Sequence, residues 1–140
     1  MDQQKSMANI FGPVIYSYTR SQAIEDGVLV DVSETAKDAG FKFPVAMTRA
    51  AWEDCVAWST DDDKRHKTYQ DEPGRLWDVV YMLFFAIKCS HCDKPEMLFK
   101  LHRVPRNGRG RLPKEIVLKS HIGPGDTPDP VITIMLPHED

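Results

Sequence analysis

The sequence predicts a single α+β domain in which a long central helix packs on a C-terminal three-stranded antiparallel sheet. Three observations lead to this prediction. The chain has 140 residues, a length that suits one hydrophobic core. Its apolar residues follow a helical period up to about residue 95, and an alternating, strand-like period from about residue 96. Helices followed by strands within one short chain are typical of α+β proteins.

The first part of the chain, over 13–95, is predicted to be mainly helical with one or two short strands, after a loose tail over 1–12. Thr19 and Gln22 have the spacing of a capping box, so a short helix is expected to begin there. The β-branched stretch 28–32 predicts a strand. Such N-terminal strands are candidates to extend the C-terminal sheet.

Two further helices are predicted before residue 60. Ser33 is a candidate cap for a helix that Gly40 ends. Thr48 is a candidate cap for a second helix, whose apolar stripe includes Trp52. The charged run over 61–67 is expected to be a loop, because it carries no apolar period.

The strongest helical pattern covers about 71–88. Asp71 and Glu72 suit the positive N-terminal end of a helix, and a proline follows them. Apolar residues at helical spacing then form one stripe: Leu76, Val79, Val80, Leu83, Phe84 and Ile87. The other faces are also mostly apolar: Trp77, Tyr81, Met82 and Phe85. We therefore expect this helix to be buried nearly all round, with Asp78 paired to Arg75 or to a backbone donor.

The last part of the chain, over 96–137, predicts an antiparallel meander. Apolar and polar residues alternate, and glycine- and proline-rich stretches at 105–113 and 123–130 supply the turns. We call 105–113 the basic loop. An unpaired edge of this sheet would allow a homodimer, so both a monomer and a homodimer are compatible with the pattern.

The net charge of −3 conceals three blocks of opposite sign. Residues 1–99 carry a net charge of −5, residues 100–121 a net charge of +6, and residues 122–140 a net charge of −4. The candidate partner-binding cations are Lys100, Arg103, Arg106, Arg109, Arg111, Lys114 and Lys119. Arginine forks suit phosphates and carboxylates, and the glycines predict a flexible loop. The alternative is a hairpin tip whose charge only prevents edge pairing.

Asp61, Asp62 and Asp63 are a second candidate for partner binding. Three adjacent carboxylates offer oxygen ligands to a hard cation, but the spacing of a calcium loop is missing and two cations follow at once. A solvated charged loop is therefore favoured over a metal site. On an acidic flank, these carboxylates would face a basic partner.

Cys89 and Cys92 have the Cys-x-x-Cys spacing with which two thiolates bind zinc. A structural site needs two more ligands, and no second motif supplies them, so helix-end thiols without a function are favoured and no cofactor is expected. Cys55 lies on an apolar stripe, which favours a core position over a nucleophile. The common catalytic motifs are absent from the sequence, so an enzyme has no support.

Several stretches together resemble a family of small uncharacterised proteins encoded on bacterial plasmids, prophages and other mobile elements. They are IYSYTR (15–20), GVLVDV (27–32), FPVAMT (43–48), WEDCVAW (52–58), GRLWDV (74–79), GPGD (123–126) and PVITIMLP (130–137). The resemblance implies the context of a mobile-element accessory protein. It implies no reaction, cofactor or catalytic residue.

These observations lead to three functional hypotheses. The first is a non-enzymatic accessory protein that binds a host or phage-encoded protein, most concretely an inhibitor of a nucleic-acid-handling defence complex of the anti-CRISPR kind. The alternative is a nucleic-acid-binding accessory protein that uses the basic hairpin over 100–121. The third is a small zinc- or thiol-dependent enzyme. A cytoplasmic location is expected, because no signal peptide or membrane-spanning run is evident and the cysteines are few.

Overall fold

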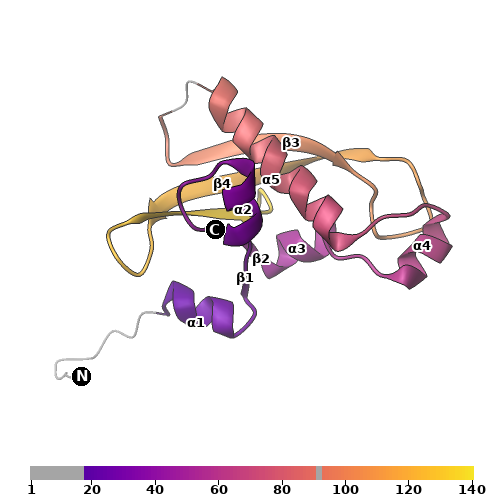
Figure 1. Cartoon of the computed structure of the whole chain (residues 1–140), viewed down its shortest axis with the longest axis horizontal. Coiled ribbons are helices and arrows are strands. Elements are labelled where there is room, and N and C mark those ends of the chain that lie inside the picture. Colours follow the sequence, from indigo (N-terminus) through magenta and orange to yellow (C-terminus); the bar gives the residue numbers. More distant parts are fainter. Residues whose placement is uncertain (1–17, 91–92) are drawn as a thin grey trace.

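A computed structural model of the chain describes residues 18–90 and 93–140 (Figure 1). Within these residues the fold is α+β, with five helices and a five-stranded mixed sheet. The helices are α1 (Arg20–Glu25), α2 (Ser33–Ala39), α3 (Arg49–Cys55), α4 (Thr60–His66) and α5 (Glu72–Cys89). The strands are β1 (Leu29–Asp31), β2 (Val45–Thr48), β3 (Glu96–Arg103), β4 (Lys114–Pro124) and β5 (Pro130–Met135).

The sheet has the strand order β1-β2-β5-β4-β3. Strands β3, β4 and β5 pair antiparallel, as the alternating pattern predicts. The prediction of a three-stranded sheet is nevertheless wrong in detail, because β2 joins β5 in parallel. The strand expected over 28–32 is confirmed as β1, which joins β2 and so extends the sheet. Three of the four residues of β2 are fully buried, Val45, Ala46 and Met47. A short strand that is buried on both faces shows no alternation, so the sequence pattern does not reveal it.

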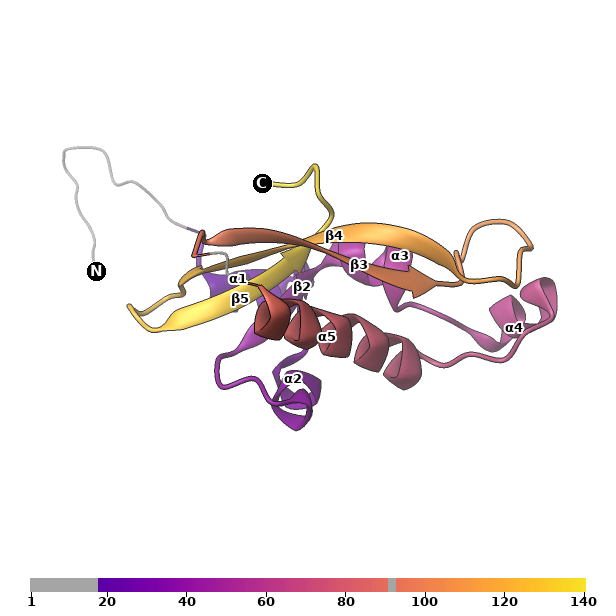
Figure 2. The ribbon, with the colours of Figure 1, turned by 90° about the horizontal axis from the view of Figure 1, so that it is seen from above.

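Helix α5 lies across one face of the sheet (Figure 2). The predicted helix over 71–88 is confirmed to within one residue, and the Asp71 side chain caps it by accepting a hydrogen bond from the Gly74 amide at 2.7 Å. Its buried side chains meet those of the three C-terminal strands in one core, which includes Val79, Val80, Leu83, Phe99, Leu118 and Ile134. This packing fixes the position of α5 relative to the β3–β4 hairpin, which carries the basic loop.

The expectation that α5 is buried all round is wrong. Trp77, Tyr81 and Phe85 are exposed and follow one another at four-residue spacing, with the first two rings stacked 6.0 Å apart. The sheet and α2 cover the inward side of α5, and an amphipathic helix needs no more than that to be held. Asp78 is also exposed, and none of the ion pairs among the described residues joins it to Arg75. Across residues 18–90 and 93–140, no helix combines the length and the apolar character needed to cross a membrane.

The charged run after residue 60 is the second error, because it forms helix α4 instead of a loop. Ser59 caps α4, and Asp62 completes a capping box with it. Acidic residues occupy the first turn of the helix and basic residues the last turn. This order complements the helix dipole and stabilises a short helix that has no apolar stripe.

The residues predicted to cap or end the other helices do so at most of the predicted positions. Thr19 and Gln22 form the predicted capping box, and Thr48 caps α3. Gly40 ends α2 in the left-handed conformation that favours glycine, with φ of 117°. Ser33 does not cap α2 and instead hydrogen-bonds β2 through the Val45 amide at 3.0 Å.

Candidate partner-binding site

The basic loop lies against α4 at one end of the molecule (Figure 2). Arg65 donates hydrogen bonds to the carbonyl oxygens of Gly108 at 3.0 Å and Arg106 at 2.9 Å. The neighbouring His66 places one ring nitrogen 2.5 Å from the Gly110 oxygen and the other 2.8 Å from the Arg106 oxygen. Two consecutive side chains of α4 therefore hold three backbone carbonyls of the loop. The loop predicted to be flexible is tied to a helix.

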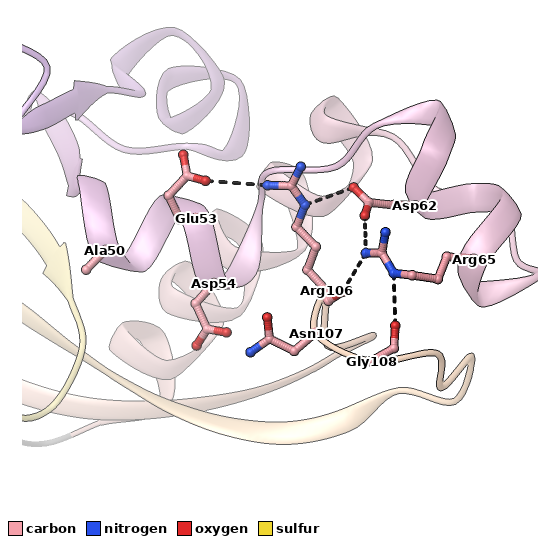
Figure 3. A pocket seen from close by; sticks show the side chains of 8 residues that line it. All are labelled: Ala50, Glu53, Asp54, Asp62, Arg65, Arg106, Asn107 and Gly108. Atoms are coloured by element: carbon pink, nitrogen blue, oxygen red, sulfur yellow. Dashed lines mark hydrogen bonds and ion pairs between the residues drawn. The ribbon is translucent and has the colours of Figure 1, made fainter.

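Asp62 is the centre of this contact (Figure 3). It is 2% exposed, and its carboxylate accepts hydrogen bonds from Arg65, from Arg106 Nε at 2.8 Å and from the Ser59 amide at 2.8 Å. Burial by itself opposes ionisation. The hydrogen bonds from Arg106, Ser59 and Arg65 outweigh it and hold the pKa of Asp62 well below its usual range. Asp62 is therefore a carboxylate with two arginine partners.

The acidic flank and the basic hairpin neutralise each other at two more places. Arg106 also reaches Glu53 at 3.4 Å, and Arg103 pairs with Asp54 at 3.1 Å. Part of this cluster lines an open hollow of about 690 Å³ (Figure 3), formed by Ala50, Glu53, Asp54, Asp62, Arg65, Arg106, Asn107 and Gly108. The charge blocks that the sequence separates thus meet in space, and much of their charge is used within the chain.

Of the three adjacent aspartates, Asp61 is the one left to solvent. Asp62 is buried in the arginine cluster, and Asp63 accepts hydrogen bonds from the Trp58 indole at 2.7 Å and the Gln70 amide at 2.9 Å. The expectation that all three act as a partner-binding acidic surface is therefore not supported by their placement. Their spacing on a helix, and not in a loop, turns their side chains in different directions.

Three of the exposed cations lie in the second half of the basic loop and at the first residue of β4. Arg109, Arg111 and Lys114 are exposed, and no ion pair among the described residues involves them. Leu112 lies among them and is 71% exposed. We call these four residues the loop tip.

The remaining two predicted cations lie away from the loop tip, on the strands. Lys100 is exposed on β3, and Lys119 on β4 donates to the backbone oxygen of Glu139. The seven candidate cations thus divide into three groups: Arg103 and Arg106 in ion pairs, Lys100 and Lys119 on the strands, and three at the loop tip. Sequence reasoning missed Arg65 and His66, which hold the loop. The signal available for them was their place in the last turn of a charged helix.

The cysteines show no prepared nucleophile among the described residues. Burial raises the pKa of the Cys55 thiol to about 11, so this side chain is protonated at neutral pH. Its core position, predicted from the apolar stripe, is confirmed. Cys89 is exposed, whereas Cys92 lies outside the described residues, so the Cys-x-x-Cys hypothesis stays a prediction. Elsewhere, in the part of the chain that the structure describes, no three histidine, cysteine or acidic side chains are grouped to hold a metal.

The fold and the loop contact define a small α+β protein with a fixed, charged loop at one end. The chain belongs to a family described as Family of unknown function (DUF6573), which matches residues 7–140. Neither a curated protein nor a solved structure gave a significant match to the chain.

Proposed function

We propose that the protein is a non-enzymatic binding protein whose loop tip contacts an acidic surface of a partner protein. One observation carries this proposal: next to an exposed leucine in the sequence are three exposed cations that form no ion pair among the described residues, on the loop that α4 holds and at the first residue of β4. A loop that is already ordered loses little conformational freedom when a partner binds, so more of the contact energy becomes affinity.

The exposed Leu112 favours a protein partner over a nucleic-acid backbone. Protein interfaces combine an apolar centre with a polar rim, and arginine is enriched in them. Contacts to phosphates need cations but no apolar side chain. A leucine that is 71% exposed between Arg111 and Lys114 matches the first arrangement.

The concrete form of this proposal is an accessory protein of a mobile element that inhibits a host defence complex in the cytoplasm. The resemblance of the sequence to proteins of plasmids and prophages supports this form. Opposite charges on the two partners would accelerate their association and select against wrong partners. The second candidate is a nucleic-acid-binding protein, which the exposed cations Arg109, Arg111 and Lys114 also favour.

The test is affinity capture from host lysate followed by binding measurements with the purified partner. The variant R109A/R111A/K114A removes the charge of the loop tip, and L112S removes its apolar side chain. Lys37, Lys42 and Lys88 are exposed cations on α2, the loop after it and α5, so K37A/K42A/K88A is the matched control. We expect both loop variants to weaken binding at least tenfold, and the control to bind as the parent does.

A parallel titration with DNA and RNA oligonucleotides at low salt separates the two candidates. If the parent binds an oligonucleotide in a salt-sensitive way, and R109A/R111A/K114A loses this binding while L112S retains it, the result would favour the nucleic-acid-binding function. Equal capture of one partner by the parent and both loop variants would refute the role of the loop tip.

A further inference from the structure

A second, smaller hollow lies at the base of the basic loop, and it has a volume of about 80 Å³. Residues from α3, α5 and β3, from the segment before α5 and from the two sides of the loop line it: Cys55, Gln70, Arg75, Asp78, His102, Arg103, Val104 and Pro113. Two guanidinium groups and one imidazole therefore face a space of a few water molecules. In the outer hollow each arginine has a carboxylate partner, whereas here Arg103 pairs with Asp54 and Arg75 forms no ion pair among the described residues.

Arg75 is a buried cation that has neutral hydrogen-bond partners. It is 4% exposed. Its Nε donates to the Val56 oxygen at 3.1 Å, and its Nη1 donates to the Val104 oxygen and to Gln70 Oε1, each at 3.0 Å. Its guanidinium also lies 4.6 Å from the centre of the Trp58 ring. None of the ion pairs found in residues 18–90 and 93–140 includes Arg75.

Among the described residues, two buried donors of this hollow lack a nitrogen or oxygen partner, Nη2 of Arg75 and Nε of Arg103, and the Cys55 thiol lies beside the Arg103 guanidinium. Arg103 uses its Nη2 in the ion pair with Asp54. Buried polar atoms without a partner are rare in folded proteins, and each one needs an explanation. Here both belong to cations and both line the same space. This coincidence indicates a ligand that accepts hydrogen bonds and carries negative charge.

The size and the charge of the hollow discriminate between water and an anion. A volume of 80 Å³ holds about two to three waters, or one oxyanion of the size of phosphate. Water would satisfy the donors, but it would add no negative charge beside Arg75, which is buried and forms no ion pair among the described residues. Burial is the main cause that lowers the pKa of Arg75; the nearby Arg103 and Arg106 also lower it, and Cys55 and Asp54 oppose them only in part. A bound anion would relieve both effects.

We infer that this hollow is a binding site for a small oxyanion with the chemistry of inorganic phosphate. The orphaned donors of Arg75 and Arg103 bind its oxygens, and Gln70 and His102 line the remaining wall. Guanidinium groups present several N–H donors in a planar fork, and this geometry suits oxyanions. Asp78, whose carboxylate lines the same hollow, weakens the binding of an anion by repulsion. The inference is independent of the proposed function, since an anion binds here whether or not the loop tip has a partner.

The test is a titration of the full chain with inorganic phosphate, followed by ³¹P NMR and by thermal unfolding against chloride at matched ionic strength. A second arm uses glycerol phosphate, which distinguishes a free anion from a phosphate group on a larger molecule. R103K keeps the positive charge and removes the Nε donor, and its ammonium group lies one bond short of the Nη2 atom that contacts Asp54. We expect R103K to bind phosphate at least tenfold more weakly. R109K, at the loop tip, is the matched control and is expected to bind as the parent does.

A second variant tests the site without removing any of its donors. D78N removes the repulsive carboxylate, and we expect it to bind phosphate several-fold more tightly. Three results would overturn the inference: no phosphate binding by the parent at 10 mM, equal binding by the parent and R103K, or unchanged binding by D78N. The last two results would place the anion on the exposed cations of the surface instead.

Discussion

Asp62 and Arg75 are both buried charges near the basic loop, and the chain treats them in opposite ways. Asp62 has two arginine partners and hydrogen bonds from Ser59. Arg75 has backbone oxygens, an amide and an indole ring around it, and one of its donors has no partner. A buried charge with opposite charges around it links the elements that carry those charges, and we call such a contact a structural joint. A buried cation whose hydrogen-bond partners are all neutral can still bind an anion.

The joint at Asp62 explains how the hairpin and α4 form one unit. Its two partners come from different elements, because Arg65 lies on α4 and Arg106 lies on the loop. Removal of one partner from a buried ion pair leaves an uncompensated charge, which costs more than the pair contributes. We therefore expect substitutions at Asp62 to lower the free energy of unfolding more than substitutions at Arg75.

The largest expected effect is that of D62A. This variant removes the carboxylate that Arg65, Arg106 and Ser59 share, and because both arginines are more than a third exposed we expect a loss of about 3 kcal/mol in the free energy of unfolding. Urea denaturation followed by circular dichroism measures it. D61A is the matched control, because Asp61 is exposed one residue earlier on the same helix, and it should change stability by less than about 0.5 kcal/mol. Equal effects of the two variants would contradict the joint.

The acid side of the stability profile gives an independent measurement of the same contact. The pKa of Asp62 is lowered in the folded state, below the unfolded value of about 4. Its contribution to stability is therefore complete above the unfolded pKa, and it is lost as the pH falls from there through the folded pKa. D62N lacks this titration. Its free energy of unfolding should fall less between pH 5 and pH 2 than that of the parent.

The next effect in size is that of R75M, and it breaks or confirms the comparison directly. The substitution leaves the Val56 and Val104 oxygens without their donor, but it also removes a buried charge that has no counter-ion. The two changes partly cancel, so we expect a loss of about 2 kcal/mol in phosphate-free buffer. A loss as large as that of D62A would mean that Arg75 is also a structural joint.

The contrast between these sites also explains what the sequence could predict. The long helix and the capping residues Thr19 and Thr48 depend on neighbours within four positions, and they were predicted correctly. Asp62 and Arg106 are 44 residues apart, so no local pattern connects them. Strand β2 was missed because it is buried on both faces and so shows no alternation of apolar and polar residues. Helix α4 was missed because its residues are charged all round and so show no apolar stripe at helical spacing.

A smaller effect is expected from H66A, which removes one of the two side chains that hold the loop. His66 contacts the Gly110 and Arg106 oxygens, and Arg65 still holds the loop after the substitution. We expect a loss of about 1–2 kcal/mol in stability. Hydrogen exchange should accelerate at the amides of 105–113 and stay unchanged in α5. Uniform acceleration in both segments would mean that His66 supports the whole fold and not this contact.

The smallest effect, that of D78N, decides whether Arg75 has an undetected carboxylate partner. Burial raises the pKa of Asp78, and the nearby Arg75 opposes this in part. Because the folded pKa lies above the unfolded one, the ionised form is disfavoured in the fold, and this penalty disappears as the pH falls through the folded pKa. Asp78 is exposed, so solvent screening keeps the effect small. We expect D78N to raise stability by up to about 0.5 kcal/mol at pH 7, and to leave it unchanged at pH 3. A loss of stability at pH 7 would identify Asp78 as the counter-ion of Arg75, and the two buried charges would then be alike.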